Sequence, residues 1–163
     1  MAFIGADGAG KTSLILRYTR NTFSTSYLAT IGCDFYEVNY EMPNNDSLQT
    51  YVWDIAAQKN FERLKNQYLS FTHLSVICVD INRNTPEYID PWIEDIKKCV
   101  PNKANYIIAL TKVDSAISKD FVSHLLTEIE TRYQVPVMDT SAKDNFHVGE
   151  LFNLIGSTLW KIK

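Results

Sequence analysis

The sequence has no long hydrophobic run, no cysteine pair and no strong excess of one charge. No apolar stretch approaches the roughly 18 residues of a membrane-spanning helix, and the N-terminus lacks a secretory signal pattern. The cysteines Cys33, Cys78 and Cys99 are widely spaced, which argues against a disulfide framework or a zinc site and favours a reducing compartment. The net charge of −3 gives no support for a nucleic-acid partner. We expect one globular domain over residues 1–163 without repeats.

Strand-like segments alternate with helical ones, which is typical of a wound α/β domain. The segments Cys33–Glu41 and Leu48–Asp54 are joined by a turn-rich link, so they are predicted to form an antiparallel hairpin. The apolar, β-branched segments Ser75–Ile81 and Asn105–Leu110 are predicted to be central parallel strands. The remaining predicted strands are Met1–Ile4 and Val135–Met138.

Four helices are predicted from apolar spacing and capping residues. Pro91 would interrupt a helix that began at Pro86, so we expect Asp90 as the N-cap of a helix with Pro91 at its first helical position. Ser118 is predicted to cap a helix that ends at Tyr133. The other two predicted helices are Lys11–Thr19 and one that begins at Val148. In the helix capped by Asp90, the residues predicted to be buried are Trp92, Ile96 and Cys99. In the helix capped by Ser118, they are Phe121, Val122, Leu125, Leu126 and Ile129.

The segment Gly5–Thr12 matches the phosphate-loop pattern G-x-x-x-x-G-K-[ST] between a predicted strand and a predicted helix. Its glycines let successive backbone N–H groups point into one concavity, and the helix adds its positive N-terminus. Lys11 is expected to reach the terminal phosphates, and the Thr12 hydroxyl is expected to ligate Mg²⁺. The remaining residues predicted to contact phosphate are Asp7, Gly8, Ala9, Gly10 and Ser13.

A phosphate loop alone fits ATPases, nucleotide kinases and GTPases, but two later segments favour guanine. Asp114, in Thr111-Lys112-Val113-Asp114, would accept hydrogen bonds from N1–H and the exocyclic amine of guanine, a pair that adenine does not offer. Lys112 would lay its alkyl stem along the base. Backbone N–H groups of Ser141-Ala142-Lys143 would donate to guanine O6. Because all three segments follow strands, they are expected to meet at the ligand crevice of one sheet.

Two further segments concern a third phosphate. Thr30 is expected to ligate Mg²⁺ through its hydroxyl and to give its N–H to the γ-phosphate. Asp54 would hold Mg²⁺ through water, and Gln58 would orient the attacking water. Lys11 and Gln58 are therefore the predicted catalytic residues, and Thr12, Thr30 and Asp54 the predicted metal site.

With these motifs the whole chain resembles the Ras superfamily of small GTPases, and within it the Rab family. Thr30–Phe35 (TIGCDF) is similar to the Rab segment that follows the first switch, and Trp53–Leu64 (WDIAAQKNFERL) is similar to the second switch. The resemblance implies that Phe23 lies against guanine and Tyr27 covers the phosphates. It also implies an effector surface made of Phe35, Trp53 and Tyr68.

The resemblance further implies a three-layer G domain whose mixed sheet has about six strands, five parallel and one antiparallel at the edge, flanked by about five helices. Expected partners are GTP, GDP, effectors, exchange factors and GTPase-activating proteins. A cytoplasmic monomer is expected, acting in vesicle traffic on the cytosolic face of an endomembrane. Because the chain has no C-terminal cysteine for a lipid, membrane attachment is expected only through a tail outside this sequence.

Three residues depart from the family pattern. Ala57 replaces the glycine of D-x-x-G, so its Cβ disfavours the positive φ values that glycine allows. Asp7 adds a carboxylate in the phosphate loop, near the attacking water. Thr111 replaces the usual asparagine but keeps a hydroxyl for the loop. These residues favour intact nucleotide binding and slow hydrolysis. The alternatives are a GTP- or GDP-binding module that does not cycle and, less favoured because of Asp114, an ATP or nucleoside-phosphate kinase.

Overall fold

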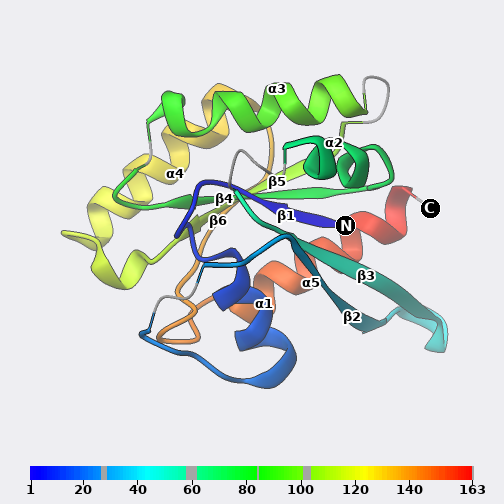
Figure 1. The fold of residues 1–163 in the computed structure, drawn as a ribbon. Coiled ribbons are helices and arrows are strands. Elements are labelled where there is room, and N and C mark those ends of the chain that lie inside the picture. Colours follow the sequence, from blue (N-terminus) through cyan, green and yellow to red (C-terminus); the bar gives the residue numbers. More distant parts are fainter. Residues whose placement is uncertain (27–28, 58–61, 84, 101–103, 163) are drawn as a thin grey trace.

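The structure is a computed structural model, and it describes residues 1–26, 29–57, 62–83, 85–100 and 104–162 (Figure 1). Strands and helices alternate along the chain as the sequence predicts. The strands are β1 (Ala2–Ile4), β2 (Cys33–Glu41), β3 (Ser47–Ile55), β4 (Ser75–Asp80), β5 (Tyr106–Thr111) and β6 (Val137–Asp139). The helices are α1 (Lys11–Arg20), α2 (Glu62–Ser70), α3 (Asp90–Cys99), α4 (Lys119–Tyr133) and α5 (Val148–Ile162).

The described strands form one six-stranded sheet in the order β2-β3-β1-β4-β5-β6. Strand β2 runs antiparallel to β3 at the edge, with Cys33 opposite Ile55 and Glu41 opposite Ser47. All other neighbouring strands are parallel. The predicted mixed sheet with one antiparallel edge strand is therefore confirmed. Because β1, β4 and β5 point the same way, their carboxyl ends meet along one edge, where the loops that follow them come together.

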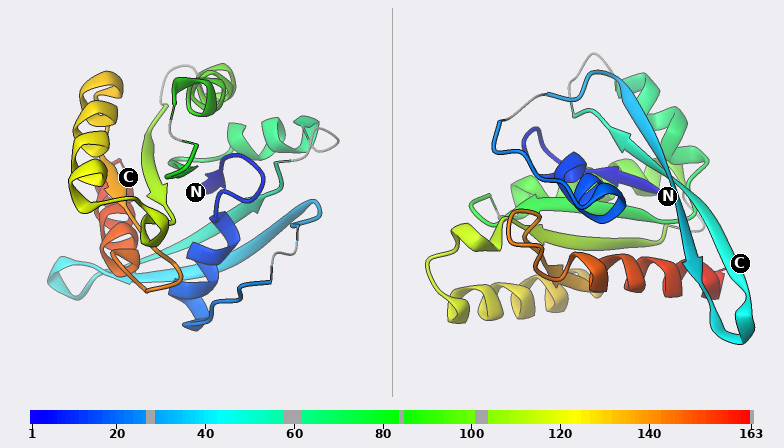
Figure 2. Two further views of the ribbon diagram at one scale, coloured as in Figure 1. Left: turned by 90° about the vertical axis from the view of Figure 1, so that its left-hand side faces the viewer. Right: turned by 90° about the horizontal axis from the view of Figure 1, so that it is seen from below.

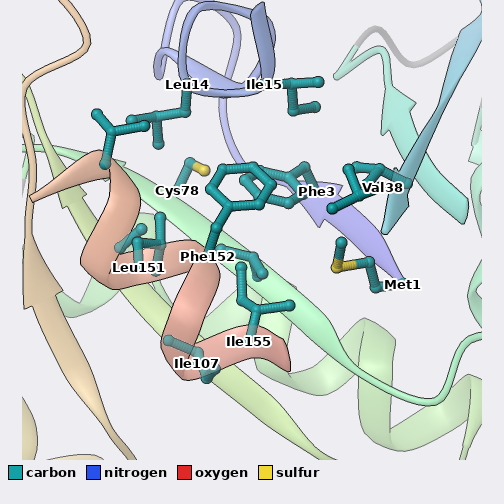
Figure 3. Packing of buried hydrophobic residues seen from close by; sticks show 14 of the residues in the cluster. Met1, Phe3, Leu14, Ile15, Val38, Cys78, Ile107, Leu151, Phe152 and Ile155 are labelled. Atoms are coloured by element: carbon teal, nitrogen blue, oxygen red, sulfur yellow. The ribbon is translucent and has the colours of Figure 1, made fainter. Parts of the chain in front are cut away.

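Helices cover both faces of the sheet, and each face has its own buried core (Figures 1 and 2). On one face, Phe152 of α5 stacks between Tyr18 of α1 and Phe3 of β1, with ring centroids 3.9 and 5.7 Å apart respectively (Figure 3 shows Phe152 and Phe3). On the other face, α2, α3 and α4 pack isoleucine and leucine side chains onto β4 and β5. None of the helices in the described residues is long and apolar enough to cross a membrane.

Helix α5 approaches strand β2 closely at a glycine. A Cβ added at Gly156 would lie 2.6 Å from Cδ1 of Tyr40, whose side chain is buried beneath the hairpin. Only a residue without a side chain fits here unless the tyrosine ring moves. The hairpin and the last helix are thus packed directly against each other.

The start of α3 differs from the prediction. Ile89, not Asp90, occupies the N-cap position, and Asp90 is the first helical residue with no side-chain capping bond. Its carboxylate instead accepts a hydrogen bond from the Tyr133 hydroxyl of α4 at 2.7 Å and lies 3.5 Å from Arg132. A tertiary contact between two helices therefore replaces the local cap.

Two predicted core faces also need correction. In α3 the fully buried residues are Ile93 and Ile96, while Trp92 and Cys99 are only partly buried. In α4 Phe121 is 37% exposed and lies outside the core, although the predicted cap is confirmed because Ser118 Oγ accepts from its N–H. The sequence predicts no range for α2, whose segment ERLKNQYLS contains few apolar residues.

Candidate nucleotide-binding site

The phosphate loop connects β1 to α1, and its glycines have backbone angles that other residues rarely adopt. Gly5, Gly8 and Gly10 have φ values of 142°, 72° and 85°. A Cβ at Gly5 would collide with the carbonyl oxygen of Cys78 on β4. The loop can therefore curl tightly against the sheet and present its N–H groups to one side, as phosphate binding requires.

Lys11 lies buried beneath this loop. Its Nζ donates to the carbonyl oxygens of Gly5 at 2.9 Å and Ala6 at 3.0 Å. Burial lowers the pKa of Lys11, whereas Cys78, Asp54 and Asp7 act in the opposite direction. The charged ammonium is thus held by the two carbonyls at the position from which the motif predicts contact with terminal phosphates.

Thr12, Thr30 and Asp54 come together at the start of α1. The Thr12 hydroxyl donates to Asp54 Oδ2 at 2.5 Å and lies 2.9 Å from the Thr30 hydroxyl. Asp54 is fully buried at the end of β3, and its Oδ1 has no hydrogen-bond partner among the described residues. Burial raises the pKa of this carboxyl, and the bond from Thr12 lowers it in part.

This cluster has the chemistry of a Mg²⁺ site. Two hydroxyl oxygens and one carboxylate are hard donors of the kind that Mg²⁺ takes beside phosphate oxygens. An unpartnered carboxylate oxygen in a buried position is also unfavourable unless a cation or a water reaches it. The three predicted metal-site residues therefore fit that ion, although they come from three separate segments of the chain.

The Thr111 side chain joins the segment predicted to bind the base to the phosphate loop. Its hydroxyl lies 2.8 Å from the carbonyl oxygen of Ala9 and 3.1 Å from that of Val79, in positions to donate to either. The expectation that threonine keeps a bond to the phosphate loop is therefore met by the geometry. Thr111 is almost fully buried, so this bond is shielded from water.

Asp114 and Ser141 face each other at the far end of the pocket. Ser141 Oγ donates to Asp114 Oδ1 at 2.7 Å, and the backbone N–H of Asp144 donates to Ser141 Oγ at 3.1 Å. Lys143 Nζ lies 3.5 Å from Asp114 Oδ2. Lys112, which has a left-handed φ of 60°, forms an ion pair of 2.8 Å with Asp80 at the end of β4.

One cavity of about 430 Å³ connects these segments. Ser141 and Asp54 do not line it but bond to residues that do. Tyr27 and Gln58 lie outside the described residues, so their predicted roles stay predictions. The predicted residues that line the cavity are Asp7, Gly8, Ala9, Gly10, Lys11, Thr12, Ser13, Phe23, Thr30, Ala57, Thr111, Lys112, Asp114, Ala142 and Lys143.

Other residues at the site have no counterpart in the sequence analysis. Thr22, Ser24, Thr25 and Ser26 also line the cavity. Arg17 of α1 donates to backbone carbonyls near Ser141, across a separation of 125 residues in the chain. No local pattern marks this arginine, because it is one of two basic residues in the last turn of an amphipathic helix.

Ala57 lines the cavity beside Ala56, whose N–H donates to the carbonyl oxygen of Gly32 at 3.0 Å. Ala57 is not among the residues with a positive φ. Its Cβ therefore causes no backbone strain in this conformation, and any cost of replacing glycine would arise in a conformation with a left-handed residue at this position.

The three aromatic residues predicted to form an effector surface are neighbours. The rings of Phe35 and Trp53 have centroids 5.8 Å apart, and Trp53 stacks on Tyr68 at 4.5 Å. Phe35 is 66% exposed, whereas Trp53 and Tyr68 are partly buried. The surface joins the edge strand β2 to β3 and helix α2.

Comparison with known proteins agrees with this arrangement. The sequence matches the Ras family over residues 1–161. It is 31% identical to the Ras-related protein Rab-1 of Theileria parva over 163 residues, which cover 96% of this chain and 71% of that protein. It is 28% identical to Ras-related protein Rab-1A of Dictyostelium discoideum and 27% identical to GTP-binding protein ypt1 of Schizosaccharomyces pombe, with 93% of this chain and 75% of each relative covered. The chain is therefore a Rab-like member of the Ras family of small GTPases.

Proposed function

We propose that this protein is a Rab-like switch that binds GTP and GDP with Mg²⁺ in the described cavity, hydrolyses GTP slowly and recruits effectors in vesicle traffic. The observation that carries the proposal is the meeting of three chemistries at one cavity: the phosphate loop, the Asp114–Ser141 pair, and the cluster of Thr12, Thr30 and Asp54. Each is compatible with several ligands, but a guanine nucleotide with a metal ion satisfies all three.

Guanine selection is assigned to Asp114. Ser141 and Lys143 hold its carboxylate in place, and its two oxygens can accept from N1–H and the exocyclic amine of guanine. Lys112 is expected to lie along the base with its ammonium held by Asp80. Adenine lacks the two matching donors, so the carboxylate would receive no hydrogen bond from the base, which is the costly outcome for a polar site.

The phosphates are assigned to the loop and to Lys11. Thr12, Thr30 and Asp54 would hold Mg²⁺, which neutralises charge on the phosphates when it is bound. Thr30 is the residue through which a third phosphate would be sensed, because its hydroxyl belongs to the metal cluster while its backbone belongs to the segment that leads into β2. Gln58 is assigned to the orientation of the attacking water.

Slow hydrolysis is attributed to Ala57 and Asp7. The carboxylate of Asp7 adds negative charge beside a polyanion and crowds the water. Ala57 restricts the backbone at the position that would give its N–H to the γ-phosphate. The competing candidate is a nucleotide-binding module that does not cycle, and it is favoured by the same Ala57.

Single-turnover GTP hydrolysis tests the role of these two residues. Ala57→Gly and Asp7→Ser are each expected to accelerate hydrolysis by about threefold or more, with GDP affinity changed less than about twofold. Unchanged rates in both variants would show that neither residue limits the reaction. A complete lack of turnover in the unsubstituted protein and in both variants would favour the module that does not cycle.

Competition binding tests the base assignment. Unlabelled GTP is expected to displace a fluorescent GDP analogue at concentrations at least about 100-fold lower than ATP does, because only guanine matches Asp114. Comparable displacement by ATP would contradict the assignment and favour the kinase alternative.

The aromatic surface of Phe35, Trp53 and Tyr68 is proposed as the place where effectors bind. Its support is the exposure of Phe35 beside a stacked pair, since aromatic residues in such positions often dominate interfaces. Exchange factors and GTPase-activating proteins are the other expected partners of a monomer that acts at the cytosolic face of an endomembrane.

A further inference from the structure

Arg17 holds the loop that follows β6, although it belongs to the helix that follows the phosphate loop. Its Nε donates to the carbonyl oxygen of Ala142 at 2.7 Å, and its Nη2 donates to that of Lys143 at 3.2 Å. Its Nη1 donates to both the carbonyl and the side-chain oxygen of Asn21, each at 3.1 Å. The planar guanidinium therefore spans two segments with fixed geometry, which a lysine ammonium does not reproduce.

A continuous hydrogen-bonded path leads from this arginine to Asp114. The carbonyl of Lys143, which Arg17 contacts, shares a peptide group with the N–H of Asp144. That N–H donates to Ser141 Oγ at 3.1 Å, and Ser141 Oγ donates in turn to Asp114 Oδ1 at 2.7 Å. Hydrogen bonds in such a chain polarise one another, so a cation at one end strengthens the bonds toward the other.

A second branch leads to the peptide between Ala142 and Lys143. The carbonyl of Ala142 accepts from Arg17, and the same peptide carries the N–H of Lys143. A charged donor on the oxygen makes that N–H a stronger donor. This N–H belongs to the segment assigned above to guanine O6.

Arg17 also contacts the third side of the base pocket. Its guanidinium carbon lies 5.9 Å from the ring centroid of Phe23, which lines the cavity. The contact is within the range of a cation–π interaction. One side chain therefore touches the 142–143 backbone and Phe23, and it reaches Asp114 through Ser141.

We propose that Arg17 is a positioning residue for guanine recognition, which fixes the orientation of Asp114 and of the 141–143 backbone through hydrogen bonds. The inference rests on the guanine pocket put forward above. A purely structural role is the competing explanation, since Arg17 also bonds the carbonyl of Asn21, the residue that caps α1. The two explanations differ in one respect: positioning of Asp114 changes the discrimination between bases, whereas a weaker helix end does not.

The test compares Arg17→Ala and Arg17→Lys with Arg20→Ala in the full chain. Arg20 is a matched control, because it is the same residue type one turn later on α1 and its guanidinium packs over Tyr36 at 5.7 Å. The probes are GDP and inosine diphosphate, which lacks the exocyclic amine that would donate to Asp114. The readouts are the dissociation rate of a fluorescent GDP and the ratio of the two dissociation constants.

Arg17→Ala is expected to accelerate GDP dissociation about tenfold or more and to reduce the preference for GDP over inosine diphosphate several-fold. Arg17→Lys is expected to behave like Arg17→Ala, because one ammonium does not bridge both carbonyls. Arg20→Ala is expected to change both readouts less than twofold or so.

Equal weakening of both nucleotides in Arg17→Ala, or no change in either, would overturn the inference. Should Arg17→Ala fail to fold, Arg17→Lys decides by the same ratio, since it keeps the charge at the helix end. Failure of the unsubstituted protein to bind GDP or to prefer it over inosine diphosphate would instead contradict the proposed pocket, so the two failures are distinguishable.

Discussion

The base end and the phosphate end of the proposed nucleotide cavity differ in the environment of their charged groups. At the base end, Asp114, Ser141, Thr111 and Arg17 are tied to each other and to backbone by hydrogen bonds between residues up to 126 positions apart in the sequence. At the phosphate end, burial raises the pKa of Asp54 and lowers that of Lys11, so each is shifted toward its neutral form. We therefore propose that the base end contributes a preset specificity, and that the phosphate end contributes sensitivity to the charge that binds there.

The largest expected effect belongs to the base end. Asp114→Ala removes the acceptor for two guanine donors and is expected to weaken GDP binding by at least about 100-fold, while ADP binding stays as weak as before. Competition against a fluorescent nucleotide measures both. Asp144→Ala is the neighbouring control, since only its backbone N–H takes part in the network. If Asp114→Ala weakened GDP binding by less than about threefold, the base end would not be the source of specificity that distinguishes it from the phosphate end.

At the phosphate end, Asp54→Asn is expected to weaken the effect of Mg²⁺ on GDP binding and to raise the stability of the folded protein. The Mg²⁺-dependent slowing of GDP dissociation should fall about tenfold, because a neutral amide holds the cation less well. Without nucleotide and with Mg²⁺ chelated, the unfolding midpoint near neutral pH should rise, by about 2–4 °C for each 1 kcal/mol gained. Thermal unfolding and dissociation kinetics with and without Mg²⁺ measure the two effects.

The pH dependence of this effect follows from the raised pKa of Asp54. Above about pH 4, near the ordinary pKa of an aspartate, the unfolded chain loses this proton while the folded protein still holds it, so stability falls as pH rises toward the folded pKa. The midpoint difference between Asp54→Asn and the unsubstituted protein should therefore grow as pH rises from about 4 toward neutral. A constant difference would show that the buried charge is not the cause.

The Thr111 hydroxyl connects the two ends of the cavity, and its removal is expected to have an intermediate effect on GDP dissociation. Thr111→Val keeps the shape of the side chain but removes the hydroxyl that bonds Ala9 and Val79. GDP dissociation is expected to accelerate about five- to tenfold, which corresponds to one lost buried hydrogen bond. Thr111→Ser, which keeps the hydroxyl, should restore most of the slow rate. Equal rates in the valine and serine variants would contradict a role for this bond.

The smallest expected effect lies outside the cavity, where Lys65 anchors α2 to α3. Its Nζ forms an ion pair with Asp95 and lies 5.1 Å from the ring centroid of Trp92. Lys65→Met leaves a partly buried carboxylate without its partner and is expected to lower the unfolding midpoint by about 2–4 °C, with GDP dissociation changed less than twofold. The double variant Lys65→Met/Asp95→Leu should recover the loss, because it also removes the unpaired charge. If the unfolding midpoint of the double variant fell as much as that of Lys65→Met, the unpaired charge of Asp95 would not be the cause.

The strands and the phosphate-loop geometry could be predicted because they depend on local patterns, whereas the six-stranded mixed sheet is implied by the resemblance to the Ras superfamily. Gly5 and Gly10 mark a turn that needs positive φ, and Ser118 marks a helix start, so neighbouring residues carry the information. The displaced cap of α3 shows the limit of such reasoning. Asp90 is a good capping residue, but its carboxylate instead accepts a hydrogen bond from the hydroxyl of Tyr133, which lies 43 residues away in the sequence.

The parts of the site that escaped prediction depend on distant contacts. Arg17 looks like an ordinary surface residue of α1 until the 141–143 segment is brought beside it. The burial of Asp54, whose Oδ1 has no partner in the part of the chain that the structure describes, likewise depends on how the hairpin packs against the phosphate loop. Residue type and order predicted which groups assemble, whereas the balance of their charges required the packed structure.

The contact between Gly156 and Tyr40 connects the proposed effector surface with the C-terminal helix. Tyr40 lies on the same edge strand as Phe35 and is opposite Leu48 across the hairpin. Since a methyl group at position 156 would collide with the tyrosine ring, Gly156→Ala requires the Tyr40 side chain or its strand β2 to move. One added methyl group on α5 would thus disturb the strand that carries Phe35 of the proposed effector surface, although Gly156 does not line the nucleotide cavity.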